Sequence, residues 1–309
     1  MRSFLAGCVL VVSAVTSAEP PPTIFTLGVL RRDAIVVPFA TYDGKQWEHH
    51  WPEPSAQVEV PISLRSVSKR WWGPTGPLDI WQTWAGTKPP SLVHVRQPDW
   101  LQAECDKQVG LRTDYQPDQR PPGPETQPYP KDGLAVSPAH VVEPLETVTS
   151  SSPESEWLPD VLRPLFAAQE DSALTRARLE GSEVHVTRKQ LDELPITLEA
   201  VYAFGTTRRV YWVEAVREYK KGDLCAAVVF GSGWLIREAG KLTLAQFDVA
   251  LAPCNRNGLS YMLPLGVLSL PRGLYWIAQW SGWDHENYGI VEIRARSITP
   301  VLVVSGGSC

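Results

Sequence analysis

Two short segments of the chain combine histidines with carboxylates: GKQWEHHW at residues 44–51 and SGWDHENY at residues 281–288. Imidazole and carboxylate groups brought together could hold a zinc or calcium ion, or transfer protons in catalysis. No metal-ligand spacing such as HExxH is present, and adjacent residues of an extended segment point to opposite faces. We therefore expect solvated loop tips and no bound metal. The candidate ligands, if a metal is bound, are His49, His50 and His285.

A hydrolase is expected to use acidic residues and the histidine in or beside the same two segments, since glycoside hydrolysis needs a pair of carboxylates. The candidates are Asp43, Glu48, Asp284, His285 and Glu286. Ser232 in FGSGW lacks the outer glycine spacing of a nucleophile elbow. The chain has no GxGxxG and no P-loop, so we predict no cofactor and no catalytic residue, and keep the hydrolase as an alternative.

Tryptophan is concentrated in two places among the 13 residues of this type. The stretch SKRWWGPTGPLDIWQTW contains four of them between Gly and Pro residues, and others recur around a turn near residue 280. A rigid ring with an N–H donor suits a surface that binds a glycan or a protein partner of the cell envelope, although small β domains also use tryptophan in their cores. The predicted ligand-binding residues are Trp71, Trp72, Trp81, Trp84, Trp280 and Trp283.

The elements that position these residues are short, β-branched or aromatic runs broken by Gly or Pro, such as VYWVEAV, LTLAQFDVAL and LYWIAQW. Such runs predict a mainly β protein of antiparallel sandwich-like or barrel-like units. Helical spacing of apolar residues occurs over about Trp157–Leu179. A second short helix is predicted over Thr187–Leu194, where Thr187 and Gln190 have the spacing of a capping box.

A faint internal repeat suggests an alternative fold. Residues 27–48 and 265–286 align without gaps at an offset of 238, with LGVL at the same place in both. Repeated hairpins build propellers or stacked sheets. A single propeller-like assembly that includes both ends of the chain is therefore the alternative to separate β units.

Charge and proline divide the chain into regions. Residues 114–156 contain 9 prolines, 8 acidic and 2 basic residues, whereas residues 19–113 and 157–309 are each balanced in charge. This composition predicts an acidic, Pro-rich linker, although residues 134–142 could lie against a domain as an added strand. We expect a β domain at 19–113 and a larger β-rich domain at 157–309. Neither has the basic excess that nucleic-acid binding requires.

Four cysteines follow the first 18 residues, and an even number in an exported chain favours disulfides. A hairpin that turns at Ala239-Gly240 would place residues opposite each other when their numbers sum to 479. Cys225 and Cys254 meet this condition, and a bulge would break it. Cys105–Cys309 is then the pair left by elimination.

The first 18 residues read as a signal peptide, with Arg2 before an apolar run and small residues before Glu19. We expect cleavage near Ala18. LAGC matches a lipoprotein motif, but most of the apolar run follows Cys8, which argues against lipidation there. No later segment is long and apolar enough to span a membrane, so we expect an exported protein of the periplasm or the extracellular space.

Three functions remain open from the sequence. The tryptophan clusters and the absence of a catalytic motif favour a non-catalytic binding or scaffold protein of the cell envelope. The alternatives are a secreted hydrolase, directed at glycans or esters, and a purely structural protein. The sequence does not indicate the oligomeric state.

Overall fold

The computed structural model describes residues 24–56, 62–86, 88–179, 188–221, 224–295 and 297–309. Strands contain 54% of the chain, and the sixteen strands of the described residues form three sheets in which neighbouring strands run antiparallel. The predicted fold class is therefore confirmed. The predicted signal peptide, with Cys8 and Ala18, and the predicted start of the second helix at Thr187 lie outside the described residues.

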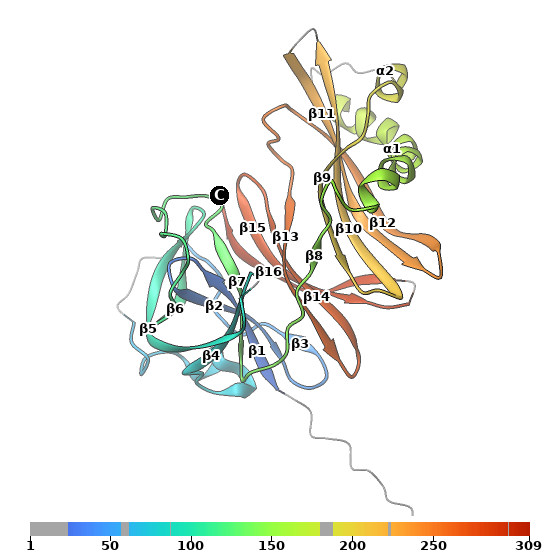
Figure 1. Ribbon diagram of the computed structural model, residues 1–309. Helices are drawn as coiled ribbons and strands as arrows, with labels where there is room; N and C mark the ends of the chain where they lie inside the picture. The colour runs from blue at the N-terminus through green and yellow to red at the C-terminus, as the bar shows by residue number, and fades with distance from the viewer. Residues whose placement is uncertain (1–23, 57–61, 87, 180–187, 222–223, 296) are drawn as a thin grey trace, which may run out of the picture.

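The N-terminal half forms a barrel (Figure 1). Its sheet has the strand order β1-β7-β4-β5-β6-β2-β3, and an additional β1–β2 pairing closes the first six of these strands on themselves. The strands are β1 (Phe25–Arg31), β2 (Ile35–Tyr42), β3 (Trp47–Glu48), β4 (Ile80–Ala85), β5 (Ser91–Ala103), β6 (Asp106–Thr113) and β7 (Lys131–Ser137). A 3-10 helix, η1 (Lys69–Thr75), precedes β4.

The barrel interior is filled by large apolar side chains around Trp81, which is fully buried and donates from Nε1 to the Leu78 carbonyl oxygen at 3.3 Å. Gly28 of β1 faces this interior. A Cβ atom at this position would lie 2.5 Å from Cγ1 of Val36 and 3.2 Å from the Trp81 ring. The absence of a side chain at residue 28 therefore makes room for the central tryptophan.

The second sheet has the order β12-β11-β10-β9-β8. Its strands are β8 (Glu146–Thr147), β9 (Thr197–Phe204), β10 (Arg208–Lys221), β11 (Leu224–Glu238) and β12 (Lys241–Ala252). The helices α1 (Glu154–Leu179) and α2 (Arg188–Asp192) cover one face (Figure 1). α1 confirms the helix predicted over Trp157–Leu179, since Leu158, Leu162 and Phe166 are fully buried against the sheet at helical spacing. None of the described helices is long and apolar enough to cross a membrane.

The third sheet, β13-β14-β15-β16, lies between the other two units (Figure 1). Its strands are β13 (Tyr261–Leu270), β14 (Gly273–Ser281), β15 (His285–Ile293) and β16 (Ile298–Ser308). Alternate residues of β14 pack in opposite directions. Trp276 and Ala278 pack against the five-stranded sheet, whereas Tyr275 and Ile277 pack against the outside of the barrel. This sheet is therefore buried on both faces and joins the molecule into one stack of layers.

The two segments of the internal repeat are neighbours in space. β1–β2–β3 and β13–β14–β15 are each antiparallel three-stranded meanders. Leu27 and Ala40 of the first share a core cluster with Leu265 and Ile277 of the second. The alternative of a single propeller-like assembly is wrong, because one meander belongs to a closed barrel and the other to an open sheet packed on it.

The two cysteine pairs lie at disulfide distance, as predicted. The Cα atoms are 6.0 Å apart in Cys225–Cys254 and 5.0 Å apart in Cys105–Cys309. The hairpin turns where expected, with Glu238 opposite Lys241, but a bulge between Trp234 and Leu235 shifts the register by one residue. Cys254 still reaches Cys225 because it lies beyond the end of β12, where the ladder no longer fixes its position.

The acidic, Pro-rich segment contributes to two sheets. Residues 131–137 form β7, which lies between β1 and β4 in the barrel. Farther along, Glu143 exchanges two backbone hydrogen bonds of 2.8 Å with Val267 at the edge of β13. The proposed domain boundaries stay predictions, but this part of the segment is held by strand pairing at both places.

Glu214 of β10 carries a buried carboxyl group between the five-stranded and four-stranded sheets. Its Oε1 accepts from Trp212 Nε1 at 2.9 Å and from the Met262 backbone N–H at 2.6 Å. Desolvation nevertheless dominates and raises the pKa of Glu214 from its ordinary value of 4.5 to about 7. The folded protein therefore holds this proton more tightly than the unfolded chain does.

We expect the free energy of unfolding to fall by about 3 kcal/mol as the pH rises from below 4.5 to above 7, because the folded state must then bury a charged carboxylate. Glu214→Gln should remove this part of the pH dependence and make the protein more stable than the wild type at pH 8. Urea unfolding at pH 5 and pH 8 measures the difference. Glu218→Gln, on the exposed surface of the same strand, is the matched control and should behave as the wild type.

Candidate functional site

A cleft of about 570 Å³ opens where the barrel, the segment before β8 and β13 meet. This volume lies in the range of small-molecule sites. Trp84, at the end of β4, shares the wall with apolar side chains of the other two elements, including Leu145 and Leu263. Lys88, Asp132 and Thr147 add polar groups. The cleft thus has an aromatic and aliphatic surface beside a set of hydrogen-bonding side chains.

Two further cavities adjoin this cleft. One of about 280 Å³ shares Lys88 and Asp132 with it and continues to Arg32, Gln119 and Tyr115. The next, of about 240 Å³, again includes Lys88 and Tyr115. We call the three together the Trp84 groove. The shared lining residues place the three cavities next to one another.

The charged side chains of the Trp84 groove occur in pairs of opposite sign. Arg32 Nε lies 2.8 Å from Asp132 Oδ1, and the Tyr115 hydroxyl donates to Asp132 Oδ2 at 3.2 Å. Lys88 forms an ion pair with Asp118. These pairs fix the positions of the side chains and leave the groove without a large net charge.

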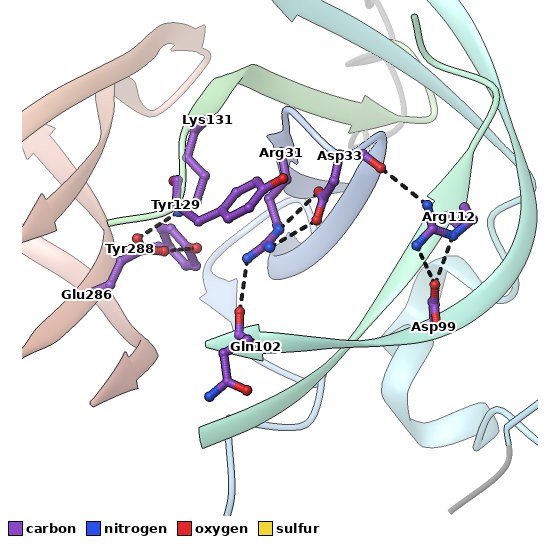
Figure 2. A network of polar contacts seen from close by, with 9 residues as sticks. All are labelled: Arg31, Asp33, Asp99, Gln102, Arg112, Tyr129, Lys131, Glu286 and Tyr288. Atoms are coloured by element: carbon purple, nitrogen blue, oxygen red, sulfur yellow. Dashed lines mark hydrogen bonds and ion pairs between the residues drawn. The ribbon is translucent and has the colours of Figure 1, made fainter. Parts of the chain in front are cut away.

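A buried polar network lies behind the groove, at the junction of β7 with the four-stranded sheet (Figure 2). Lys131 Nζ lies 2.7 Å from Glu286 Oε2, and the two side chains are 1% and 5% exposed. Tyr288 donates its hydroxyl proton to Glu286 Oε1, and Gln279 Nε2 donates to Oε2 at 2.9 Å. Burial raises the pKa of Tyr288 well above its ordinary value, so this phenol remains a donor.

The network continues into the barrel through Arg31 (Figure 2). Its guanidinium donates to both carboxylate oxygens of Asp33 at 3.2 and 3.0 Å and to the Gln102 carbonyl oxygen at 3.2 Å. It also lies over the Tyr129 ring, 3.9 Å from the centroid. The Tyr129 carbonyl oxygen in turn accepts from Lys131 Nζ at 2.7 Å. Arg31 and Lys131 are thereby both held by Tyr129, one through its ring and the other through its carbonyl oxygen.

Glu104 is the second buried carboxyl group at this junction. It is 7% exposed, and its Oε2 has no hydrogen-bond partner among the described residues. Glu104, Lys131 and Glu286 line one small chamber of about 10 Å³, roughly the space of one water molecule. Desolvation, followed by the charge of Glu286, raises the pKa of Glu104.

The six predicted ligand-binding tryptophans do not form one platform. Trp72 and Trp81 are buried in the barrel core, and Trp71 packs partly against it. Trp280 lies edge-on to Trp212, with ring centroids 6.3 Å apart, between the two C-terminal sheets. Trp283 is 71% exposed at the turn before β15. Trp84 is the one of the six that lines the groove.

The two acid–histidine segments are engaged in separate local contacts. His49 Nδ1 lies 2.7 Å from the Phe39 carbonyl oxygen, whereas His50 Nε2 lies 3.0 Å from Glu48 Oε2. His285 Nδ1 pairs with Asp284 Oδ1 at 2.8 Å. Among the described residues, no group of three His, Cys, Asp or Glu side chains is placed to hold a metal ion.

Asp43, the remaining hydrolase candidate, closes a turn by accepting the backbone N–H groups of Lys45 and Gln46 at 2.7 and 2.8 Å. These two bonds lower the pKa of its carboxyl group. The hydrolase alternative stays a prediction from the sequence. Glu286 is the one of its candidates that joins a larger polar network, and it does so through Lys131 rather than through a neighbouring histidine.

Sequence reasoning missed Lys131, Glu104 and Asp132, which belong to no motif and come from the predicted linker or a turn. The one available signal was an isolated Lys-Asp pair before the apolar residues LAV in a Pro-rich segment. Comparisons of the chain with protein-family models, with curated proteins and with solved structures found no match.

Proposed function

We propose that this chain is an exported, non-catalytic binding protein that takes a neutral oligosaccharide in the Trp84 groove. The observation that carries the proposal is the groove itself, in which a cleft with an aromatic and aliphatic wall shares lining residues with a polar cavity. Pyranose rings have apolar faces that pack on indole and hydroxyl groups that bond to side chains such as Asp132 and Gln119. An amphipathic surface of this kind matches that chemistry.

The paired charges support a neutral ligand over a charged one. Lys88 is paired with Asp118, and Arg32 is paired with Asp132. A charged ligand that is attracted by one member of a pair would therefore be repelled by the other member. Hydroxyl groups can donate to the carboxylates and accept from the cations without disturbing either pair. A polyhydroxylated chain uses both kinds of group at once.

Export is part of the same proposal. The leader-like first 18 residues and the two cysteine pairs at disulfide distance support it, since disulfides persist in the periplasm and outside the cell. An exported protein meets cell-wall and surface glycans, which places the expected ligand within reach. We propose that the mature chain begins near Glu19.

Replacing Trp84 with alanine should weaken oligosaccharide binding at least tenfold, or about 1.4 kcal/mol, because the ligand loses its stacking surface. The probes are a panel of neutral cell-wall and plant oligosaccharides, screened against the disulfide-bonded protein and followed by calorimetry of each one that binds. Trp283→Ala removes an exposed tryptophan outside the groove and is the matched control, with unchanged affinity expected. Failure of the whole panel to bind, or equal affinity of the Trp84→Ala protein, would contradict the proposal.

A further inference from the structure

We propose that Lys131 and Glu286 become joined by an intramolecular amide bond that cross-links the barrel to the four-stranded sheet. The two residues are 155 positions apart and lie on β7 and β15, strands of different sheets (Figure 2). Nζ and Oε2 are 2.7 Å apart, and both side chains are almost completely buried from solvent. Lys131 also lines two cavities of the Trp84 groove, but the inference concerns the stability of the molecule and does not rest on the proposed function.

The bond forms by condensation. Transfer of one proton from the Lys131 ammonium to the Glu286 carboxylate gives a neutral amine and a neutral carboxylic acid. The amine nitrogen attacks Cδ, the C–N bond forms, and the hydroxyl group leaves with one amine proton as water. No oxidant, reductant or other reactant is needed.

Burial favours the neutral reactants. Moving two charges out of water is costly, so burial lowers the free-energy cost of transferring the proton within the pair. Desolvation lowers the pKa of Lys131 despite the neighbouring carboxylate. The Tyr129 carbonyl oxygen accepts from Nζ at 2.7 Å and holds the amine beside its target.

Two donors are aimed at the carboxyl group that is attacked. The Tyr288 hydroxyl donates to Oε1 and Gln279 Nε2 donates to Oε2. In the tetrahedral intermediate the negative charge develops on Oε1, where the Tyr288 hydroxyl stabilises it, while Oε2 becomes the hydroxyl group that leaves as water. The same contacts polarise the carboxyl group before attack.

Glu104 is placed to move the protons. Its carboxyl group shares the small chamber with Lys131 and Glu286, and its Oε2 has no partner among the described residues. A protonated Glu104 donates to the leaving hydroxyl group and takes a proton from the amine nitrogen, so it ends as it began. Desolvation raises the pKa of Glu104 and thus favours this protonated form.

The test is the intact mass of the purified full chain after denaturation and reduction, together with its tryptic peptides. The expected mass is lower by one water molecule than that of the sequence from its measured N-terminus. Trypsin should fail to cleave after Lys131, and a branched peptide should join residues 131 and 286. Lys131→Arg should have its full sequence mass, whereas the exposed-strand control Lys241→Arg should still lose water.

Glu104→Gln and Tyr288→Phe test whether these two side chains assist formation of the amide bond, or whether the closeness of Lys131 and Glu286 is sufficient. Each should slow formation of the branched peptide by about a hundredfold or more, because one removes the proton carrier and the other a donor to the oxyanion. The wild-type measurement does not depend on whether these variants fold. A wild-type chain of full mass that trypsin cleaves after Lys131, or a loss of water without the 131–286 branched peptide, would overturn the proposal.

Discussion

Replacing both Cys105 and Cys309 with alanine should lower the free energy of unfolding by about 5 kcal/mol in the chain-entropy description of disulfides. The two residues are 204 positions apart, so this bond closes most of the chain into one loop and strongly restricts the unfolded state. It also fixes the last strand, β16, to the barrel, where the Cys105 backbone N–H donates to the Ser308 carbonyl oxygen at 3.2 Å. The proposed amide would shorten the loop and bring the loss nearer 4 kcal/mol.

The Cys225–Cys254 pair provides the comparison. Its residues are 29 positions apart, and replacing both with alanine should cost about 3 to 4 kcal/mol by the same reasoning. Guanidinium chloride unfolding of the wild type and the two double variants measures the losses under identical conditions. An equal or greater loss for the Cys225–Cys254 variant would mean that loop length does not determine the ranking.

Local features of the fold could be predicted from the sequence because they depend on a few neighbouring residues. The turn between β11 and β12 has positive φ angles at Ala239 (49°) and Gly240 (77°), as tight hairpin turns require. The glycine in the sequence therefore indicated the position of the turn. The bulge that follows has no comparable signal. Its extra residue, Ala245, packs against the core cluster between the five-stranded and four-stranded sheets, and most members of that cluster come from outside this hairpin.

The closure of the barrel could not be predicted, because it rests on pairings between distant segments. β7 lies between β1 and β4, yet its sequence, KDGLAVS, is short and follows a Pro-rich stretch that indicates a linker. The composition of this segment does not favour a strand, but hydrogen bonds to β1 and β4 on its two sides hold it as one. Residues 131–137 therefore take their structure from their surroundings.

The tryptophans of β4 show why the candidate site was only partly predictable. Trp81 and Trp84 have opposite parity along the strand, so one faces the interior and the other the outside. Both faces of β4 carry large apolar residues, since the exposed Ile80 points the same way as Trp84, and alternation alone cannot tell which face is inside. The partners of Trp84 in the groove come from residues 142–147 and 263–265, which contain no motif.

The buried ion pair between α1 and β10 should be sensitive to the loss of one partner. Arg217 Nη1 lies 2.9 Å from Glu170 Oε1, and the two side chains are 1% and 0% exposed. Desolvation raises the pKa of Glu170 and lowers the pKa of Arg217, while their mutual attraction opposes both shifts. Arg217→Met should lower the free energy of unfolding by about 3 to 5 kcal/mol, because it leaves the Glu170 carboxylate buried beside one remaining cation.

The double variant Arg217→Met/Glu170→Leu tests the physical reason for that loss. If the cost comes from the unpaired charge, apolar side chains of similar size at both positions should restore most of the stability. Arg188, which also bonds to Glu170, keeps Asp192 as a partner and does not become a new unpaired charge. Urea unfolding of the wild type, both single variants and the double variant gives the coupling energy. Additive losses would show instead that each side chain stabilises the helix–sheet contact through packing alone, as the position of Arg217 5.4 Å from the Phe166 ring centroid would allow.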